Sequence, residues 1–85
     1  MNEREQEILK EIKEHLGGRG IDVAGVTPEA RIAEDLDLDS LDTVELTLGL
    51  EKRFGVEIPD EEAEGLATVG DVVSLISTKL GAVGV

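Results

Sequence analysis

Residues 35–73 read DLDLDSLDTVELTLGLEKRFGVEIPDEEAEGLATVGDVV, and this stretch contains the signals for three successive helices. The first is predicted to run from Ser40 to about Phe54. Asp39 is suited to be its N-cap, Asp42 stands at the third helical position, and Gly55 ends it.

The two later helices of this stretch are predicted from the same kinds of signal. A short helix is expected over about residues 60–66. The last helix begins after Thr68, its N-cap, with Asp71 three residues later, and ends at Gly81. Its apolar face consists of Val69, Val72, Val73, Ile76 and Leu80.

An amphipathic helix is predicted ahead of this stretch, over about residues 2–16. Asn2 can cap it with Glu5 as the capping-box partner, and Gly17 and Gly18 are expected to end it in the left-handed conformation. A long, glycine-containing loop follows, and several of its apolar residues must be pinned under the helices.

The predicted fold class is therefore all-α, a small four-helix bundle with a long first loop and a short third helix. No strand pattern is present apart from an ambiguous VEI at residues 56–58. The 85 residues are expected to form one domain, with frayed ends at 1–2 and 81–85.

The composition restricts the kinds of partner. Twenty acidic and 8 basic residues give a net charge of −12, which repels nucleic acid and anionic membranes and attracts basic protein surfaces. No apolar run is long enough to cross a membrane, there is no cysteine, and the N-terminus does not have the order of a secretory signal. We expect a cytoplasmic monomer that binds proteins.

The helix after Asp39 has two apolar faces. One, formed by Thr43, Leu46, Leu50 and Phe54, is assigned to the core, and the other, Ser40, Val44 and Leu48, repeats every four residues on a different side. Gly49, in the middle of this helix, indicates close packing by another element. The second face therefore predicts a surface that begins at the Ser40 hydroxyl.

Ser40 is a poor candidate for a catalytic nucleophile. A serine needs an adjacent base, and the single histidine, His15, belongs to a different helix. Neighbouring carboxylates oppose a developing alkoxide. The chain is therefore not predicted to be an enzyme, and Ser40 is better interpreted as the target of another enzyme, since the free N–H groups at a helix N-terminus suit a phosphate.

A calcium loop is the competing interpretation of the same segment. Asp35, Asp37 and Asp39 alternate as in an EF-hand, but the glycine and the bidentate glutamate of that pattern are replaced by Ser40 and Leu46. We therefore predict no dedicated metal site.

The quoted stretch resembles the bacterial acyl carrier proteins of type II fatty-acid and polyketide synthases. The resemblance rests on the D-S-L motif at residues 39–41, the T-V-E-L that follows it and the I-P-D-E-E turn at 58–62, and it covers about residues 32–76. It implies that Ser40, flanked by Asp39 and Leu41, carries 4′-phosphopantetheine derived from coenzyme A, on which acyl chains are held as thioesters.

The resemblance also implies partners and their contact residues. The partners are a phosphopantetheinyl transferase (a holo-carrier synthase) and ketosynthase, acyltransferase, reductase and dehydratase enzymes with basic patches. The expected docking residues are Asp39, Leu41, Asp42, Val44, Glu45 and Leu48. The acyl chain is expected in a cleft lined by Leu46, Leu50 and Ile58.

The chain departs from the family pattern in three places. The first loop, with GGRGIDVAGV at residues 17–26, is slightly long and glycine-rich. Lys52 and Arg53 stand where fatty-acid carriers frequently have acidic residues, and Asp37-Leu38 replaces a small Gly-Ala pair. Fatty-acid biosynthesis is the expected pathway. A dedicated polyketide or other specialised pathway is the alternative, and an unmodified acidic helical interaction module is a remote one.

Overall fold

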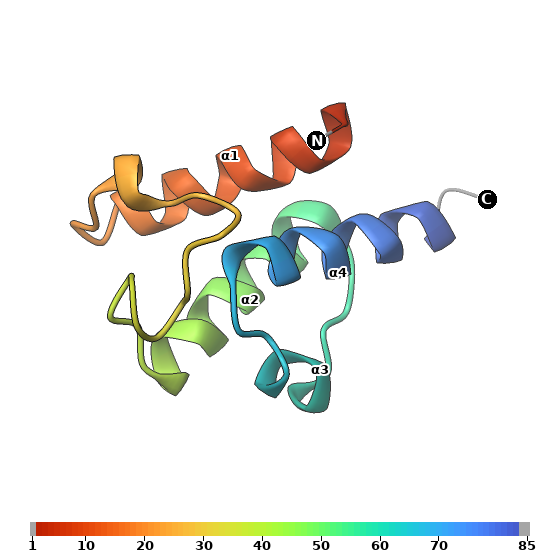
Figure 1. Cartoon of the computed structure of the whole chain (residues 1–85). Coiled ribbons are helices and arrows are strands. Elements are labelled where there is room, and N and C mark those ends of the chain that lie inside the picture. Colours follow the sequence, from red (N-terminus) through yellow and green to blue (C-terminus); the bar gives the residue numbers. More distant parts are fainter. Residues whose placement is uncertain (1, 84–85) are drawn as a thin grey trace.

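The computed structural model describes residues 2–83 and contains four α-helices and one short 3-10 helix (Figure 1). They are α1 (Glu3–Gly17), η1 (Val23–Gly25), α2 (Ser40–Phe54), α3 (Asp60–Glu64) and α4 (Val69–Val83). The predicted all-α bundle is confirmed. Within the described residues, β-type pairing is limited to an isolated bridge between Arg31 and Thr68, and the ambiguous 56–58 segment is irregular.

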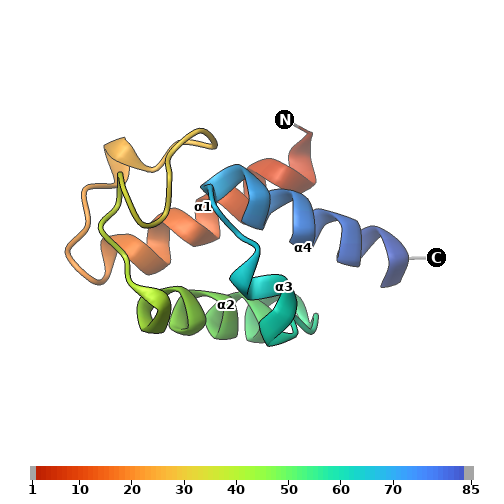
Figure 2. The same ribbon diagram turned by 60° about the horizontal axis from the view of Figure 1, so that its bottom comes forward.

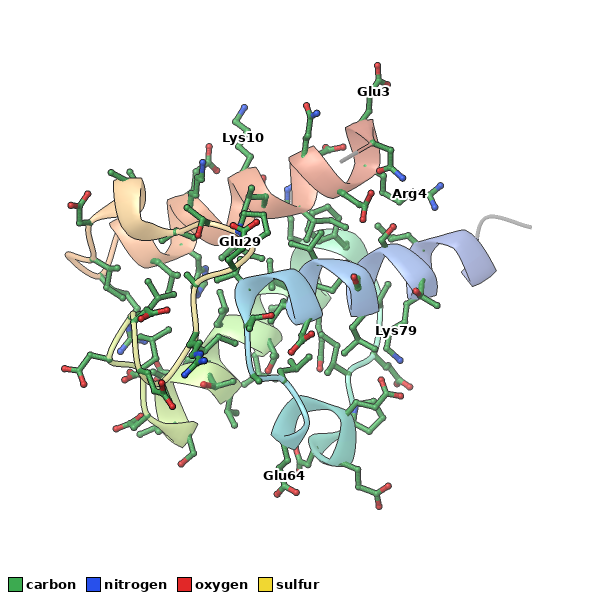
Figure 3. All side chains as sticks on the ribbon, viewed as in Figure 1. Glu3, Arg4, Lys10, Glu29, Glu64 and Lys79 are labelled. Carbon is green, nitrogen blue, oxygen red and sulfur yellow. The ribbon has the colours of Figure 1, made fainter. Side chains whose placement is uncertain are left out.

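Three long helices surround the core. Helix α1 packs against both α4 and α2, and the short α3 lies on α2 (Figure 2). Charged side chains such as those of Glu3, Lys10 and Glu64 project outward (Figure 3). The core is aliphatic, and its most deeply buried members are Ile8, Ile12, Leu16, Val26, Leu46, Leu50, Val69, Val72, Val73 and Ile76.

The long first loop contributes to this core, as predicted. Its buried apolar residues are Val26, Ala30, Ile32, Leu36 and Leu38. The loop is held in place by three backbone hydrogen bonds to the segment before α4 and to its first turn. Ile32 N–H donates to the Ala67 carbonyl and Val69 N–H to the Ala30 carbonyl, both at 3.0 Å, and Gly70 N–H donates to the Pro28 carbonyl at 2.8 Å. The loop is therefore a packed part of the domain.

The three predicted caps are confirmed. In α1 the backbone N–H of Glu5 donates to Asn2 Oδ1 at 2.8 Å, and in α2 that of Asp42 donates to Asp39 Oδ1 at 2.9 Å. In α4 the backbone N–H of Asp71 donates to Thr68 Oγ1 at 3.2 Å. Each of these caps satisfies N–H groups that a helix start otherwise leaves without an intrahelical partner.

The ends of three helices differ from prediction. Gly18 is right-handed, with φ −64°, because successive 3-10 bonds continue the right-handed path to Gly20, where φ reaches 87°. Helix α3 stops at Glu64, two residues early. Helix α4 does not stop at Gly81 but continues to Val83, since a glycine weakens a helix by only about 1 kcal/mol and no proline follows. Residues 1, 84 and 85 of the expected frayed ends lie outside the described residues.

The core face of α2 also differs in detail. Leu46 and Leu50 are buried as predicted, whereas Thr43 and Phe54 are half-buried. Thr47, not assigned to the core from the sequence, is buried, and its hydroxyl donates to the Val44 carbonyl at 2.8 Å. That internal bond lets a polar side chain enter the core.

Candidate functional site

Ser40 is the first residue of α2 and is exposed to solvent. The cap of this helix is made by Asp39, and within the described residues the Ser40 hydroxyl makes no hydrogen bond. The hydroxyl is therefore not engaged in capping the helix and is accessible from outside.

The carboxylate of Asp39 is held in its charged form. Its pKa lies below the ordinary value, first because the backbone N–H of Asp42 donates to it, with a smaller contribution from the nearby Arg19 guanidinium. Ser40 thus follows an anionic cap and stands at the positive end of the α2 dipole.

The six predicted docking residues occur together on the exposed side of α2 or at its start. Leu41, Val44 and Leu48 are exposed by 66, 38 and 48%, although they are large and apolar. The carboxylates of this face belong to Asp39, Asp42 and Glu45, of which Asp42 is half-buried and the other two are exposed. We call these six residues the docking face.

Sequence reasoning missed a cation on this face. Arg19, in the loop after α1, bonds with one guanidinium nitrogen to Asp42 Oδ1 and with the other to Glu45 Oε2. The partners lie 23 and 26 residues away in the chain. The helical repeat of a sequence identifies side chains that are neighbours because they lie three or four residues apart. It could not have revealed a contact between residues this distant in the chain.

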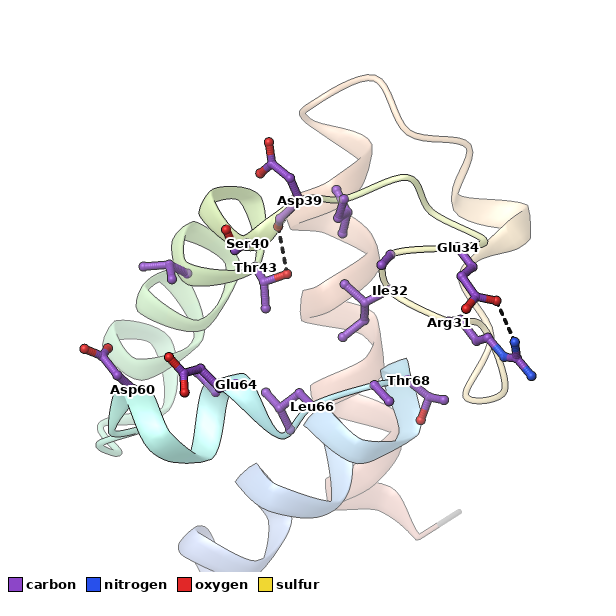
Figure 4. Close-up of a pocket in the computed structure, with 15 residues that line it drawn as sticks. Arg31, Ile32, Glu34, Asp39, Ser40, Thr43, Asp60, Glu64, Leu66 and Thr68 are labelled. Carbon is purple, nitrogen blue, oxygen red and sulfur yellow. Dashed lines mark hydrogen bonds and ion pairs between the residues drawn. The ribbon is translucent and has the colours of Figure 1, made fainter.

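A cavity of about 840 Å³ opens beside Ser40 (Figure 4). Ser40, Thr43 and Val44 of α2 form one wall, Asp60 and Glu64 of α3 another, and the apolar lining consists of Ile32, Ala33, Leu38, Ala63, Leu66 and Ala67. An aliphatic chain attached near Ser40 could thus enter an apolar space directly.

The three predicted cleft residues do not line this cavity. Leu46, Leu50 and Ile58 are only 2, 1 and 6% exposed and belong to the core cluster. The sequence pattern identified them as inward-facing. The sequence pattern did not show that the cavity lies beside the first turn of α2, before Leu46 and Leu50 in the chain.

The single histidine of the chain does not lie beside Ser40. His15 packs against Gly49, where an added Cβ would lie 2.5 Å from the imidazole Cε1. Gly49 is nine residues beyond Ser40, about 13 Å along the helix axis. The predicted close packing at Gly49 is confirmed, and the histidine is the residue that packs there.

Two of the three aspartates of the competing calcium-loop interpretation are used by the chain itself. Asp35 Oδ2 accepts a hydrogen bond from the Arg31 N–H at 2.8 Å, and Asp39 caps α2. Among residues 2–83 there is no group of three or more metal-ligating side chains. No helix in that range is long and apolar enough to span a membrane.

Comparison with known proteins gives concordant results. Residues 6–76 match the family described as "Phosphopantetheine attachment site". The acyl carrier protein of Thermosynechococcus vestitus is 52% identical over 79 residues, covering 92% of this chain and 98% of the relative. The acyl carrier protein of Rubrobacter xylanophilus is 53% identical over 72 residues, covering 84% of this chain and 89% of the relative.

A solved structure of the acyl carrier protein from Enterococcus faecalis shares the fold. It aligns with a TM-score of 0.74 at 36% identity, covering 88% of this chain and 96% of that one.

Proposed function

Because the chain belongs to the acyl carrier protein family, we propose that Ser40 is the residue that bears its 4′-phosphopantetheine arm. Family membership makes the chain a carrier and not an enzyme: acyl chains are held on the arm, whose thiol supplies the thioester chemistry. The protein supplies attachment, orientation and docking.

The observation that supports Ser40 is its exposed position at the start of α2 with the cap made by Asp39. The helix N-terminus favours the phosphate of the arm, and the apolar cavity begins at the same residue. The other serines, Ser74 and Ser77, lie inside α4, away from any helix start. Attachment forms a phosphodiester between the serine oxygen and the phosphorus of the arm. The pyrophosphate linkage of coenzyme A breaks, adenosine 3′,5′-bisphosphate leaves, and the serine proton passes to solvent.

Intact mass spectrometry tests the assignment. The wild-type chain, incubated with coenzyme A and a phosphopantetheinyl transferase, should gain the mass of one arm. Ser40→Ala should remain folded and gain nothing, whereas the control Ser74→Ala should be modified like the wild type. An arm on Ser40→Ala would show that another residue is the site, and an unmodified wild type would favour the unmodified interaction module.

We also propose that the docking face is the surface recognised by partners. The family interacts with a phosphopantetheinyl transferase and with enzymes of fatty-acid synthesis. For this chain we propose ketosynthase, acyltransferase, reductase and dehydratase enzymes with basic patches. Opposite charges mainly raise the association rate, and apolar anchors mainly lengthen the lifetime of the complex.

Association kinetics with a bacterial phosphopantetheinyl transferase at two salt concentrations separate these roles. Glu45→Lys should slow association and reduce its salt dependence, while Val44→Asp should speed dissociation. Glu29→Lys is the matched control, since Glu29 is exposed on the first loop and belongs to no ion pair in the described part of the chain. Equal rates for Glu45→Lys and Glu29→Lys, together with an unchanged dissociation rate for Val44→Asp, would exclude α2 as the docking element.

The cavity beside Ser40 is the proposed entrance for the acyl chain. A chain that also reached Leu46, Leu50 and Ile58 would have to separate packed core side chains, so the contact with these three residues stays a prediction. A single carrier domain over residues 1–85, a monomeric state and a cytoplasmic location belong to the same proposal.

Fatty-acid biosynthesis is the proposed pathway. The polyketide alternative rested partly on Lys52 and Arg53, which stand where fatty-acid carriers frequently have acidic residues, and the position of Arg53 weakens that argument. Arg53 is turned toward α1, where its Nε lies 3.1 Å from Glu11 Oε1 and Nη2 lies 3.8 Å from Glu7 Oε1. Its charge is therefore balanced by α1. Lys52 remains exposed and keeps the polyketide alternative open.

A further inference from the structure

The docking face already holds a cation supplied by its own chain. Arg19 bonds to Asp42 through one nitrogen and to Glu45 through another, so a single guanidinium bridges two carboxylates three residues apart on α2. Two such charge-assisted bonds from one planar group are the geometry by which an arginine on a binding partner would recognise this face.

The backbone around Arg19 is fixed by a series of hydrogen bonds. Arg19 N–H donates to the Leu16 carbonyl at 3.0 Å and Gly20 N–H to the Gly17 carbonyl at 3.1 Å. Gly20 then reverses the chain with φ 87°, and Ile21 N–H returns to the Leu16 carbonyl at 3.1 Å. This turn places Arg19 beside α2, so the guanidinium is held at the face before any partner arrives.

The bridge is accessible to a partner. The side chains of Arg19, Asp42 and Glu45 are 37, 23 and 50% exposed. The Arg19 pKa is raised, first by the hydrogen bond to Glu45, so the group stays charged at every physiological pH. An exposed pair of this kind adds little to stability, because solvent screens it. It does change the charge that an approaching molecule meets, since one of the three negative charges of the face is compensated.

We propose that Arg19 is a specificity-determining residue of the docking face: it occupies the carboxylate oxygens that a partner's basic side chain would use, and so restricts docking to partners whose own cations replace it. This inference rests on the proposed function, because it assumes that partners dock at α2. The partner that fits is a protein surface with at least two neighbouring basic side chains, one for each carboxylate that Arg19 releases.

The alternative role for Arg19 is that of a structural tether for the first loop. The two roles predict opposite results. A tether, once removed, lowers the melting temperature and slows docking because the loop becomes disordered beside α2. A competitor, once removed, leaves the melting temperature nearly unchanged and speeds docking because the carboxylates become free.

Stopped-flow association with a bacterial phosphopantetheinyl transferase at low salt tests the proposal. Arg19→Gln should associate about two- to fivefold faster than the wild type, with a steeper salt dependence. Arg4→Gln is the matched control, because it makes the same change in net charge at the far end of the molecule, at the start of α1 (Figure 3). Arg4→Gln should change the rate by much less. At about 0.5 M salt the difference between the two variants should vanish.

A double-mutant cycle adds a second criterion. If Arg19 compensates Glu45, Glu45→Gln should slow association more in the Arg19→Gln background than in the wild type. Additive effects, or an Arg19→Gln rate at or below that of Arg4→Gln, would overturn the proposal.

Val44→Asp distinguishes this failure from a failure of the docking face. If Val44→Asp weakens docking while Arg19→Gln behaves like Arg4→Gln, only the role of Arg19 is wrong. If Val44→Asp and Glu45→Lys both dock like the wild type, the docking face itself is wrong, and the inference about Arg19 fails with it.

Discussion

Helices α2 and α4 have the same length, 15 residues, and both begin with a cap in which an aspartate three residues on takes part. Their first turns differ completely. In α4, Val69, Val72 and Val73 are at most 1% exposed. In α2, Leu41 and Val44 face solvent beside Ser40.

The surroundings of the two helix starts explain this difference. The first N–H groups of α4 are covered by the first loop: Val69 donates to the Ala30 carbonyl and Gly70 to the Pro28 carbonyl at 2.8 Å. Nothing in the described chain covers the start of α2 in this way. A helix N-terminus with a nearby serine therefore becomes a candidate attachment site only where packing leaves it open.

The largest contrast is expected in stability. Ile76→Ala in α4 removes a fully buried side chain and should lower the free energy of unfolding by about 3 kcal/mol. Leu48→Ala in α2 should lower it by less than about 1 kcal/mol, because that side chain is half-exposed. Urea denaturation of the two variants measures both values. Similar losses would mean that the exposed face of α2 is packed in solution.

A smaller contrast concerns Gly70 in α4 and Gly49 in α2. A Cβ at Gly70 would lie 2.9 Å from the Pro28 carbonyl oxygen, a backbone atom that cannot move freely. Gly70→Ala should therefore lower the free energy of unfolding by about 1–2 kcal/mol. At Gly49 the obstacle is the exposed His15 side chain, which can rotate away.

Gly49→Ala should change the free energy of unfolding by less than about 1 kcal/mol, because the higher helix propensity of alanine offsets the cost of displacing the imidazole. The double variant with His15→Ala removes the obstacle and should be more stable than Gly49→Ala with His15 present. Thermal melts of the three variants test this order. A Gly49→Ala variant as unstable as Gly70→Ala would place His15 in a rigid contact.

The caps of the two helices should respond alike to acid. The pKa of Asp39 is lowered, first by the backbone N–H of Asp42, and that of Asp71, first by the backbone N–H of Ala67. A carboxylate with a lowered pKa stabilises the fold above its unfolded value of about 3.9, and this contribution is lost as pH falls through the folded pKa.

Melting temperatures of Asp39→Asn and Asp71→Asn against the wild type, from pH 7 to about pH 3, measure this contribution. The difference in melting temperature from the wild type should be greatest at neutral pH and should shrink as the pH falls below about 4. Glu29→Gln, a neutralised carboxylate without an ion pair among residues 2–83, controls for net charge. A gap that stays constant with pH would show that the caps do not act through charge.

The smallest effect is expected from salt. Residues 34–64, which include α2 and α3, contain 12 acidic and 2 basic residues, whereas α4 carries only Asp71 and Lys79. Screening should raise the melting temperature by a few degrees between about 20 and 200 mM salt. The melting temperature of the double variant Glu61→Gln/Glu64→Gln should rise less with salt than that of the wild type. An equal rise would mean that the repulsion does not come from these two carboxylates.

The sequence predicted local structure better than long-range contacts. The starts of α1, α2 and α4 follow from caps that act within three residues, and these were correct. The end of α4 was wrong, because Gly81 is a weak stop without a proline after it. The Arg19 bridge depends on how the first loop meets α2, and no pattern within α2 encodes that contact. The burial of Thr47 was also not evident from the apolar pattern, because threonine is polar.

Asp37 shows how a departure from the family pattern can be understood. It has φ 54°, in the left-handed region, at the position where the resemblance places a glycine. Aspartate is among the few residues with a side chain that adopt this conformation readily. The backbone turn before α2 is therefore kept although the residue differs, and the neighbouring Leu36 and Leu38 are both buried.

The exposed apolar stripe of α2 also governs how copies of this protein behave toward one another. Leu41, Val44 and Leu48 form a patch of the kind that makes proteins stick together. Each copy carries a charge of −12, so two stripes that approach at low ionic strength meet mutual repulsion first. Added salt shortens the reach of that repulsion to about 10 Å or less, and self-association through the stripe should then increase. Salt therefore has two effects: it stabilises the fold of a single chain by screening repulsion within it, and it favours association by screening repulsion between copies.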